Sequence, residues 1–338
     1  MNESAPTLSV VIPMYNEEAV LPLLAERLRP ALDRLGDSYE VVAVDDGSKD
    51  DTAALVHMMR ATWPQLRLIR LRRNSGHQAA LTAGLHRSRG AYVVSIDADL
   101  QDPPETIETM LRMAQEQKLD IVYGIRSDRS TDTAFKRFSA GLYYRLMRRI
   151  VGKKVPAGAG DFRLLSRSMV EALRDLPERT PVYRLLVPWL GFPSGEVTYV
   201  RDKRAAGTSK YPLAKMIKLT ADSIVGFTAA PLRTATWLGG IGALVCAVLT
   251  VKTLMAYVMG ETVPGWTSLF LALLFLGTLQ LICLGLLGEY VGRIFQATQD
   301  RPAYYVGYDS LTEPAPRPRT EAQPATTAKQ QPAATAKR

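Results

Sequence analysis

The chain has 338 residues, 47% of them hydrophobic, and a formal net charge of +9. This length is sufficient for one large domain together with a further structural unit. The positive charge does not indicate a nucleic-acid-binding protein, because no basic helix or aromatic platform accompanies it. Most of residues 1–210 has the mixed, charged pattern of a globular domain, whereas long apolar stretches lie beyond it.

Short apolar runs alternate with helix-like segments through the first hundred residues. The predicted strands are Leu8–Ile12, Tyr39–Val44, Leu66–Leu71 and Tyr92–Ile96, and the predicted helices are Glu17–Leu35, Thr52–Thr62 and Gly76–Arg87. This alternation indicates a mostly parallel sheet with helices on both faces. In such open sheets, ligands bind beyond the carboxyl ends of the strands. The acidic pairs Asp45-Asp46 and Asp97/Asp99 fall at that edge.

The pattern becomes less regular after Asp120. Ile121–Tyr123 predicts another strand, and an amphipathic region follows at Thr133–Val151. Ser166 is expected to cap the N-terminus of a helix that ends at Leu176. Residues 1–211 together are expected to form one cytoplasmic domain.

Two apolar stretches, Thr234–Val258 and Trp266–Tyr290, are each long enough to cross a bilayer, which takes about 20 residues. Lys and Arg residues crowd positions 201–218 before the first stretch, and Arg293 and Arg301 follow the second. The positive-inside rule therefore predicts a two-helix transmembrane hairpin with both ends in the cytoplasm. We expect a multi-pass protein of the cell inner membrane or plasma membrane.

The segments that flank the predicted hairpin (234–290) have different compositions. Residues 212–233 alternate apolar side chains with lysines, which predicts an amphipathic helix on the membrane surface. Residues 291–310 are assigned to a C-terminal juxtamembrane segment. Residues 311–338 are rich in Pro, Ala, Thr, Gln and Lys and predict a disordered tail.

The clearest chemical signal is VVSIDADLQDPPE, residues 93–105, in which an apolar run stops at Asp97. Asp97 and Asp99 are separated by one residue, and two carboxylates at a strand end can hold Mg²⁺ or Mn²⁺ together with substrate phosphates. The alternative is a solvent-exposed acidic turn with no metal. This alternative is less favoured, because a second acidic pair, Asp45-Asp46, is predicted at the same edge. For Asp102 we favour a solvated turn or a cap of the helix after Pro103.

Four motifs follow one another in order: VVIPMYNEE (10–18), VDDGSKDDT (44–52), NSGHQAALTAG (74–84) and DADLQDPPE (97–105). With GDFRLLSR (160–167) and the apolar hairpin, the chain resembles the polyprenyl-phosphate glycosyltransferases of family 2, relatives of dolichyl-phosphate mannose synthase. The resemblance covers most of the chain. It implies a GT-A fold, which is a Rossmann-like α/β domain, followed by juxtamembrane amphipathic helices and a two-helix transmembrane hairpin.

The resemblance also implies which residues surround the nucleotide-sugar: Pro13, Tyr15, Glu17, Val44, Asp46, Asp97, Ala98, Gln101, Arg126 and Lys210. The first three would line the nucleoside pocket, and Asp46 and the Val44 backbone would lie near the base and ribose. Asp97-Ala98-Asp99 would be the DXD motif, with Asp99 coordinating Mg²⁺ or Mn²⁺. Gln101, Arg126 and Lys210 would lie near the sugar and phosphates, although charge alone is equally consistent with Arg126 and Lys210 as surface residues.

The implied reaction is the inverting transfer of a sugar from a nucleotide-sugar to a polyprenyl phosphate embedded in the bilayer. UDP-glucose is the first expectation for the donor, with GDP-mannose and UDP-linked amino sugars as alternatives. The resemblance marks Asp161 as a catalytic carboxylate, but an anionic acceptor phosphate needs no strong base. Asp161 is therefore left as a base, a positioning group or a structural residue. The resemblance also implies a homo-oligomer, namely a tetramer, as one option for the assembly of the protein.

Other classes of protein fit the sequence less well. A processive polysaccharide synthase would carry a Gln-x-x-Arg-Trp signature and more membrane helices. A nucleotidyltransferase would have a Gly-rich, lysine-bearing loop where this chain has PMYNEE, residues 13–18. A non-catalytic membrane scaffold remains as an alternative, against which the intact acidic pairs count.

The histidines and cysteines lack the spacing of a metal site or a catalytic triad. His57, His77 and His86 are each interpreted as ordinary surface or core histidines. Cys246 and Cys283 lie inside the apolar stretches, where we interpret them as small hydrophobic residues.

Overall fold

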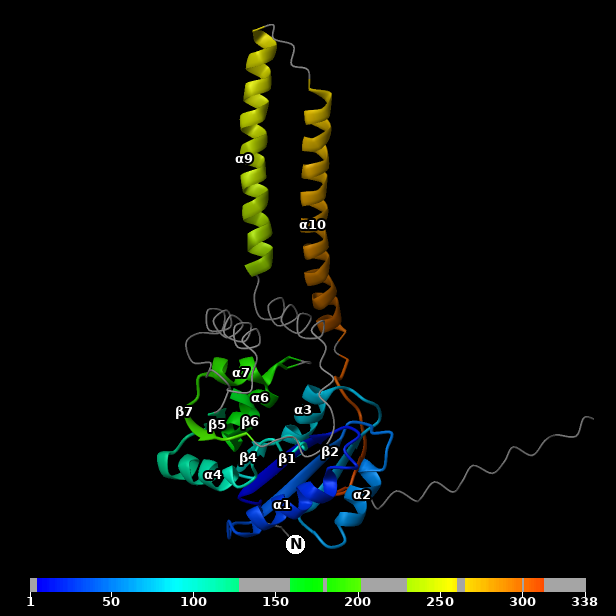
Figure 1. The fold of residues 1–338 in the computed structure, drawn as a ribbon, viewed down its shortest axis with the longest axis vertical. Helices are drawn as coiled ribbons and strands as arrows, with labels where there is room; N and C mark the ends of the chain where they lie inside the picture. The colour runs from blue at the N-terminus through cyan, green and yellow to red at the C-terminus, as the bar shows by residue number, and fades with distance from the viewer. Residues whose placement is uncertain are drawn as a thin grey trace, which may run out of the picture.

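The computed structural model describes residues 5–127, 159–178, 181–201, 230–259, 265–299 and 301–312. The described residues form an α/β domain, from which a pair of long helices extends (Figure 1). We call the α/β part, residues 5–201 and 301–312 as far as they are described, the head domain.

An eight-stranded sheet forms the centre of the head domain, in the order β7-β5-β6-β4-β1-β2-β3-β8. The strands are β1 (Leu8–Met14), β2 (Tyr39–Asp45), β3 (Leu66–Leu71), β4 (Tyr92–Ser95), β5 (Ile121–Arg126), β6 (Ala159–Ser166), β7 (Ser194–Tyr199) and β8 (Val306–Asp309). Neighbours among the first four strands are parallel. β6 runs antiparallel to both β4 and β5, and β8 runs antiparallel to β3. The sheet is thus mixed, with the predicted parallel half intact.

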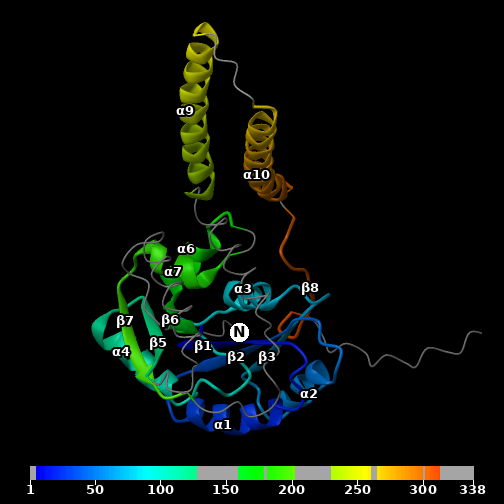
Figure 2. The same ribbon diagram turned by 45° about the horizontal axis from the view of Figure 1, so that its top comes forward.

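Helices cover both faces of the sheet (Figures 1 and 2). The described helices of the head domain are α1 (Leu21–Asp33), α2 (Thr52–Met59), α3 (His77–Arg87), α4 (Thr106–Gln117), α6 (Arg167–Arg174) and α7 (Tyr183–Leu190). One apolar core contains buried side chains of α1, α2 and α4, and the other contains those of α3, α6 and α7. The fold is therefore a three-layer α/β/α domain.

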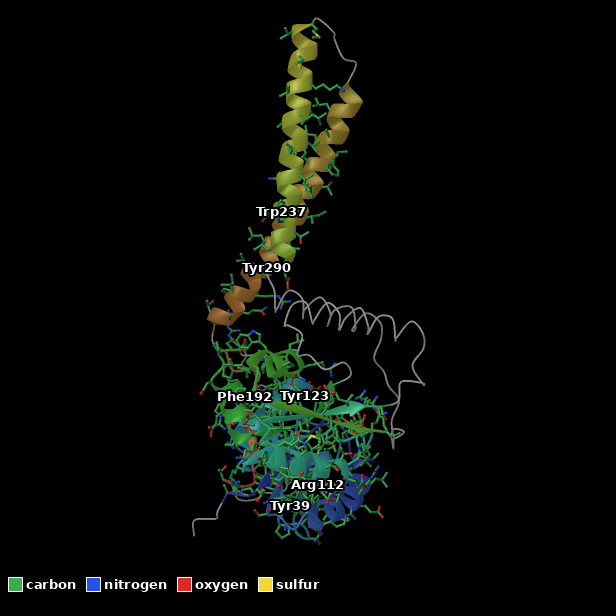
Figure 3. All side chains as sticks on the ribbon, turned by 90° about the vertical axis from the view of Figure 1, so that its left-hand side faces the viewer. Tyr39, Arg112, Tyr123, Phe192, Trp237 and Tyr290 are labelled. Carbon is green, nitrogen blue, oxygen red and sulfur yellow. The ribbon has the colours of Figure 1, made fainter. Side chains whose placement is uncertain are left out.

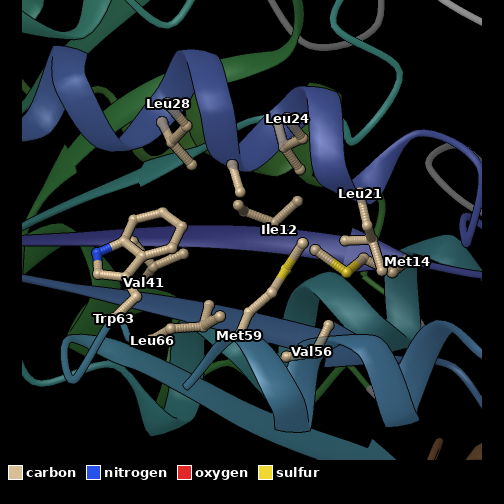
Figure 4. Close-up of a pocket in the computed structure, with 11 residues that line it drawn as sticks. Ile12, Met14, Leu21, Leu24, Leu28, Val41, Val56, Met59, Trp63 and Leu66 are labelled. Carbon is tan, nitrogen blue, oxygen red and sulfur yellow. The ribbon is translucent and has the colours of Figure 1, made fainter. Parts of the chain in front are cut away.

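The central strands are mostly apolar because both faces are covered. In β1, Val10 and Ile12 belong to the core under α1, whereas Val11 belongs to the opposite core. Figure 4 shows the packing beneath α1, where Leu24 and Leu28 face Ile12 across a small space lined by apolar side chains. This space belongs to the hydrophobic core, and it offers no polar group for a nucleotide-sugar.

The predicted strands and helices of the first hundred residues are confirmed, with shifted ends. The largest shift is at α1, which begins at Leu21 and not at Glu17. The backbone N–H groups of Glu17 and Glu18 instead donate to the side chains of Thr52 and Asp50. Ser166 caps α6 as predicted, because its hydroxyl accepts a hydrogen bond from the Met169 N–H at 3.2 Å.

Two long helices follow the head domain, α9 (Ala230–Val258) and α10 (Trp266–Thr298), and they lie alongside each other (Figures 1 and 3). Within the described residues, one helical segment, Ala272–Thr298, is long and apolar enough to cross a membrane. The apolar part of α9, Thr234–Leu249, is shorter. The prediction of an apolar C-terminal region is therefore confirmed for one candidate span, and the two-span hairpin remains a prediction.

The chain returns to the head domain after α10. β8 adds to the free edge of β3, and the Ser310 N–H donates to the Leu68 carbonyl at 2.9 Å. The sequence assigned residues 291–310 to a juxtamembrane segment, but the structure extends α10 to Thr298 and places β8 in the sheet. Three segments with predicted properties lie outside the described residues. They are the amphipathic region Thr133–Val151, most of the predicted amphipathic helix 212–233, and the tail beyond Thr312.

Candidate active site

The loops after β1 and β2 are bonded to each other at the carboxyl edge of the sheet. The Asp46 N–H donates to the Met14 carbonyl at 2.9 Å, and the Asn16 N–H donates to the Ser48 hydroxyl at 2.9 Å. Asn16 has a φ of 56°, a left-handed conformation that asparagine tolerates well. These bonds fix the segment that contains Tyr15, which is 38% exposed and accessible to a ligand.

Asp46 holds the loop that precedes α3. Its two carboxylate oxygens accept hydrogen bonds from the N–H groups of Ser75, at 2.7 Å, and Gly76, at 2.8 Å. Gly47 is required at the next position, because its φ is 68° and a Cβ there would lie 2.7 Å from the Arg73 carbonyl carbon. Asp46 therefore positions the start of α3, and its predicted contact with the base and ribose remains a prediction.

The acidic turn begins directly after β4. Asp97 and Asp99 are partly exposed, whereas Ala98 between them is 4% exposed. Asp99 accepts a hydrogen bond from the Gln101 N–H at 3.2 Å, and Leu100 has a φ of 57°. The predicted DXD residues and Gln101 thus share one tight turn at the predicted edge of the sheet.

The surroundings of Asp97 disfavour its negative charge. Burial raises the pKa of the carboxyl to about 6, His77 opposes this effect, and the nearby carboxylates of Asp161, Asp102 and Asp99 add to it. A bound cation would offset the negative charge of this cluster and so favour the ionised form of Asp97.

The oxygen ligands of this turn fit a hard divalent cation. The described residues contain no group of three or more His, Cys, Asp or Glu side chains placed to enclose a metal ion. The protein would supply Asp97 and Asp99, and the remaining ligands would be phosphate oxygens and water. Mg²⁺ is commonly bound in this way, through one or two carboxylates and substrate phosphates.

Asp161 lies on β6 and is surrounded by cationic side chains. Its Oδ1 is 2.7 Å from the Arg163 Nη2, and its Oδ2 is 3.6 Å from both the His77 Nε2 and the Arg184 Nη2. Burial alone would raise the pKa of Asp161, but the nearby His77 imidazole and the charges of Arg163 and Arg184 hold it well below its usual range. Asp161 is therefore ionised and a weak base, which suits a positioning role better than proton abstraction.

His77 connects the two acidic positions. Its Nε2 lies 3.7 Å from the Asp97 Oδ1 and 3.6 Å from the Asp161 Oδ2. Burial lowers the pKa of His77, but the adjacent carboxylates of Asp161 and Asp97 outweigh burial and raise it. The interpretation of His77 as an ordinary histidine was wrong in this respect, because its ring lies between two predicted site residues.

Asp102 is neither a solvated turn residue nor a helix cap, and that prediction was wrong. It is 2% exposed and accepts a hydrogen bond from the Tyr199 hydroxyl, while α4 begins after Glu105 without a side-chain cap. The Arg126 Nε also donates to the Tyr199 hydroxyl, at 3.4 Å. The Asp102–Tyr199–Arg126 chain connects the acidic turn to β5 and β7.

The structure therefore brings together Asp97, Asp99, Asp161 and Arg126, all of which the sequence indicated. The sequence reasoning missed His77, Arg184 and Tyr199. The position of His77 in NSGHQ, at the start of a helix that follows a strand, was a usable signal for the site edge. Arg184 and Tyr199 had no comparable signal. Lys210 lies outside the described residues.

Comparisons with known proteins agree with this architecture. Residues 9–174 match the model of the family described as Glycosyl transferase family 2. The uncharacterized glycosyltransferase YkcC of Bacillus subtilis (strain 168) is 39% identical over 302 residues, which cover 88% of this chain and 92% of that protein. The Bactoprenol glucosyl transferase of Shigella phage SfX is 38% identical over 303 residues, which cover 88% of this chain and 98% of that protein.

A solved structure of glucosyl-3-phosphoglycerate synthase from Mycobacterium tuberculosis, in complex with Mn²⁺, UDP and glucosyl-3-phosphoglycerate, is more distant. It has a TM-score of 0.43 and 22% sequence identity, and covers 65% of this chain and 78% of that chain. Similarity at this level assigns no residue or ligand here. The two relatives near 40% identity match nearly the whole chain, and the chain therefore belongs to glycosyl transferase family 2.

Proposed function

We propose that the protein transfers glucose from UDP-glucose to a polyprenyl phosphate at the cytoplasmic face of a cell membrane. The observation that carries the proposal is the joint presence of a family 2 domain and an apolar C-terminal helix in a chain that is 38% identical to a Bactoprenol glucosyl transferase along 88% of its length. A donor that is soluble and an acceptor that stays in the bilayer require a catalytic domain held at the membrane surface.

In this proposal, Asp97 and Asp99 would hold Mg²⁺ or Mn²⁺ when the donor is bound. The ion would stabilise negative charge on the departing nucleoside diphosphate. Arg126 supports that charge from β5, where its guanidinium is oriented by Tyr199. Pro13, Tyr15 and Glu17 line the nucleoside side, on the segment that is bonded to the loop after β2.

The acceptor phosphate attacks the anomeric carbon directly. A phosphate oxygen forms the new bond to carbon as the bond to the nucleoside diphosphate breaks, and the electron pair leaves with the diphosphate. Because the attacking oxygen is already anionic, the weakly basic Asp161 is not required as a proton acceptor. A single displacement inverts the configuration of the sugar.

The proposed localisation is a multi-pass arrangement in the cell inner membrane or plasma membrane, with α9 and α10 as spans. α10 provides the candidate span Ala272–Thr298. Arg293 and Arg301, near and beyond its end, favour a cytoplasmic location for the segment that returns to the head domain.

The test uses the full-length chain in lipid nanodiscs with undecaprenyl phosphate and a panel of sugar nucleotides. We expect a lipid-linked product with UDP-glucose, with the opposite anomeric configuration to the donor by NMR. Product formed only from GDP-mannose or a UDP-amino sugar would change the donor assignment. Binding of sugar nucleotides without transfer to any polyprenyl phosphate would favour a scaffold and contradict the proposal.

A further inference from the structure

Two arginines lie next to Asp161, but they differ in burial and in their hydrogen bonds. Arg163 is 2% exposed, and its guanidinium donates to the Tyr183 carbonyl, the Gly160 carbonyl and Asp161, at 2.7–2.9 Å. Arg184 is 35% exposed, and its Nη2 is 3.6 Å from the Asp161 Oδ2, beyond a good hydrogen bond. Arg163 is thus bonded within the protein. Arg184 is only partly exposed, and its Nε is buried without a hydrogen-bond partner, so donors of its guanidinium remain for a ligand.

The two carboxylates next to His77 have different neighbours. Asp97 and Asp99 make one side acidic, which suits a metal-bound diphosphate. On the other side, Arg163 and Arg184 outnumber the single carboxylate of Asp161. A phosphate monoester near neutral pH would be repelled by the acidic turn, but an arginine fork can bind it at two points. The positive side of the site therefore fits a second anionic substrate.

The position of α7 fits an acceptor that arrives from the membrane. α7 lies on the face of the sheet that also carries α3 and α6, the face toward α9 and α10 (Figures 1 and 2). Trp189, near the end of α7, is 57% exposed, and tryptophan is enriched at membrane–water interfaces. Arg184 lies at the start of the same helix, adjacent to Asp161.

We propose that Arg184 binds the phosphate group of the acceptor lipid and that Asp161 is the positioning residue for the guanidinium. This inference rests on the proposed function and deepens it, because it names the residue that recognises the acceptor. The phosphate would be held on the side of the site opposite to the leaving diphosphate, as a direct displacement requires. His77, between Asp97 and Asp161, marks the boundary between the two halves.

The test compares Arg184→Gln and Arg184→Lys with the wild-type full-length protein. Loss of a charged hydrogen-bond donor should raise the KM for polyprenyl phosphate about tenfold or more, with the Kd for UDP-glucose unchanged. Arg184→Lys should recover part of the affinity, because it keeps the charge but loses the fork. Arg112→Gln is the matched control: Arg112 is exposed on α4, which packs in the other core from that of α7.

Two acceptors and one inhibitor separate phosphate binding from lipid contact. Farnesyl phosphate in detergent and undecaprenyl phosphate in vesicles should both show the raised KM, and inorganic phosphate should compete with the acceptor less effectively in Arg184→Gln. A defect seen with vesicles alone would mean that Arg184 contacts the membrane surface and would overturn the proposal. An unchanged acceptor KM, or an equal loss of UDP-glucose affinity, would overturn it as well.

Failure of the proposed function would look different. A wild-type protein that transfers no sugar rejects the function, but the binding of farnesyl phosphate to wild-type and Arg184→Gln protein can still be measured by calorimetry. Thermal unfolding of each variant identifies a folding defect. If Arg184→Gln is unstable, Arg184→Lys provides the same comparison, and farnesyl phosphate binding equal to wild type would reject the phosphate contact.

Discussion

Arg67 and Asp309, 242 positions apart in the chain, form a buried two-point ion pair. The Arg67 Nε is 2.9 Å from the Asp309 Oδ1, and the Nη2 is 2.7 Å from the Oδ2. Arg87 adds a contact of 3.0 Å to the same Oδ2. Since Asp309 ends β8 and Arg87 ends α3, the segment that follows α10 is bonded to the helix whose first residue, His77, lies in the candidate site.

The first prediction is that Asp309→Asn destabilises the head domain by about 3–5 kcal/mol, because it leaves the buried guanidinium of Arg67 beside a neutral side chain. Chemical denaturation of the full-length protein in detergent measures the change. Asp37→Asn, at an exposed position before β2, is the control and should have little effect. Equal stability of the two variants would mean that the ion pair does not hold β8 in place.

The second prediction concerns pH. Burial raises the pKa of Asp309, but its hydrogen bonds with Arg67 and the charges of Arg67 and Arg87 outweigh burial and lower it below the ordinary value. The unfolded chain takes up a proton at about pH 4, whereas the folded protein resists protonation until the pH is lower. The stabilisation is therefore present above about pH 4 and is lost as the pH falls toward the lowered pKa.

Unfolding midpoints measured between pH 3 and pH 7 check this prediction. The wild type should lose stability relative to Asp309→Asn as the pH decreases, so that the difference between them narrows toward the acidic end. A constant difference across the range would show that protonation of Asp309 is not linked to folding.

The third prediction uses two truncations that differ only in the returning segment. A chain that ends at Thr312 keeps β8 and should retain activity and stability, because the removed tail has the composition of a disordered segment. A chain that ends at Gln299 keeps α10 but exposes the edge of β3, and we expect it to be less stable and prone to aggregation. A head domain truncated before Pro212 would lack β8 in the same way, so it is a poor test of membrane anchoring.

The parallel half of the sheet could be predicted because each strand is buried on both faces. β1 and β2 are mostly hydrophobic for that reason, with uninterrupted apolar runs over 10–14 and 41–44, and the acidic turn after β4 stands out against them. β8 could not be predicted in the same way. VGYD is four residues long, follows a membrane-type helix, and gains its strand character only by pairing with β3.

The site shows the same division between local and long-range information. The pair Asp97/Asp99 is a local pattern, and its place at the sheet edge followed from strand order. The burial of Asp102 depends on Tyr199, which is 97 positions away and reaches the acidic turn from β7. A contact of that kind is set by tertiary packing, so from the sequence alone a carboxylate shortly before a helix looked like a cap.

The fourth prediction is that Tyr199→Phe weakens the acidic turn without removing a predicted metal ligand. The change leaves the buried carboxylate of Asp102 without its hydroxyl partner, which costs about 1–3 kcal/mol. We expect lower stability and a reduced kcat, because Arg126 also loses a hydrogen-bond partner. Tyr92→Phe, on a partly exposed tyrosine of β4, is the control for loss of a hydroxyl group. A kcat equal to that of the control would show that the Asp102–Tyr199–Arg126 contacts do not contribute to catalysis.

The last prediction tests the metal assignment through the two acidic ligands. Asp99→Asn keeps the shape of the side chain and should still accept the hydrogen bond from the Gln101 N–H, so the turn should remain folded. Because it removes one of two charged ligands, transfer should fall by a factor on the order of 10² or more, and the Mn²⁺ concentration for half-maximal activity should rise. Asp97→Asn should act in the same direction.

Asp102→Asn, at the buried carboxylate bonded to Tyr199, is the control that distinguishes metal binding from structural support of the turn. It should reduce stability while leaving the Mn²⁺ requirement close to that of the wild type. Full transfer by Asp99→Asn in excess chelator would mean that the turn binds no metal, and that Arg126 and its cationic neighbours stabilise the leaving diphosphate alone.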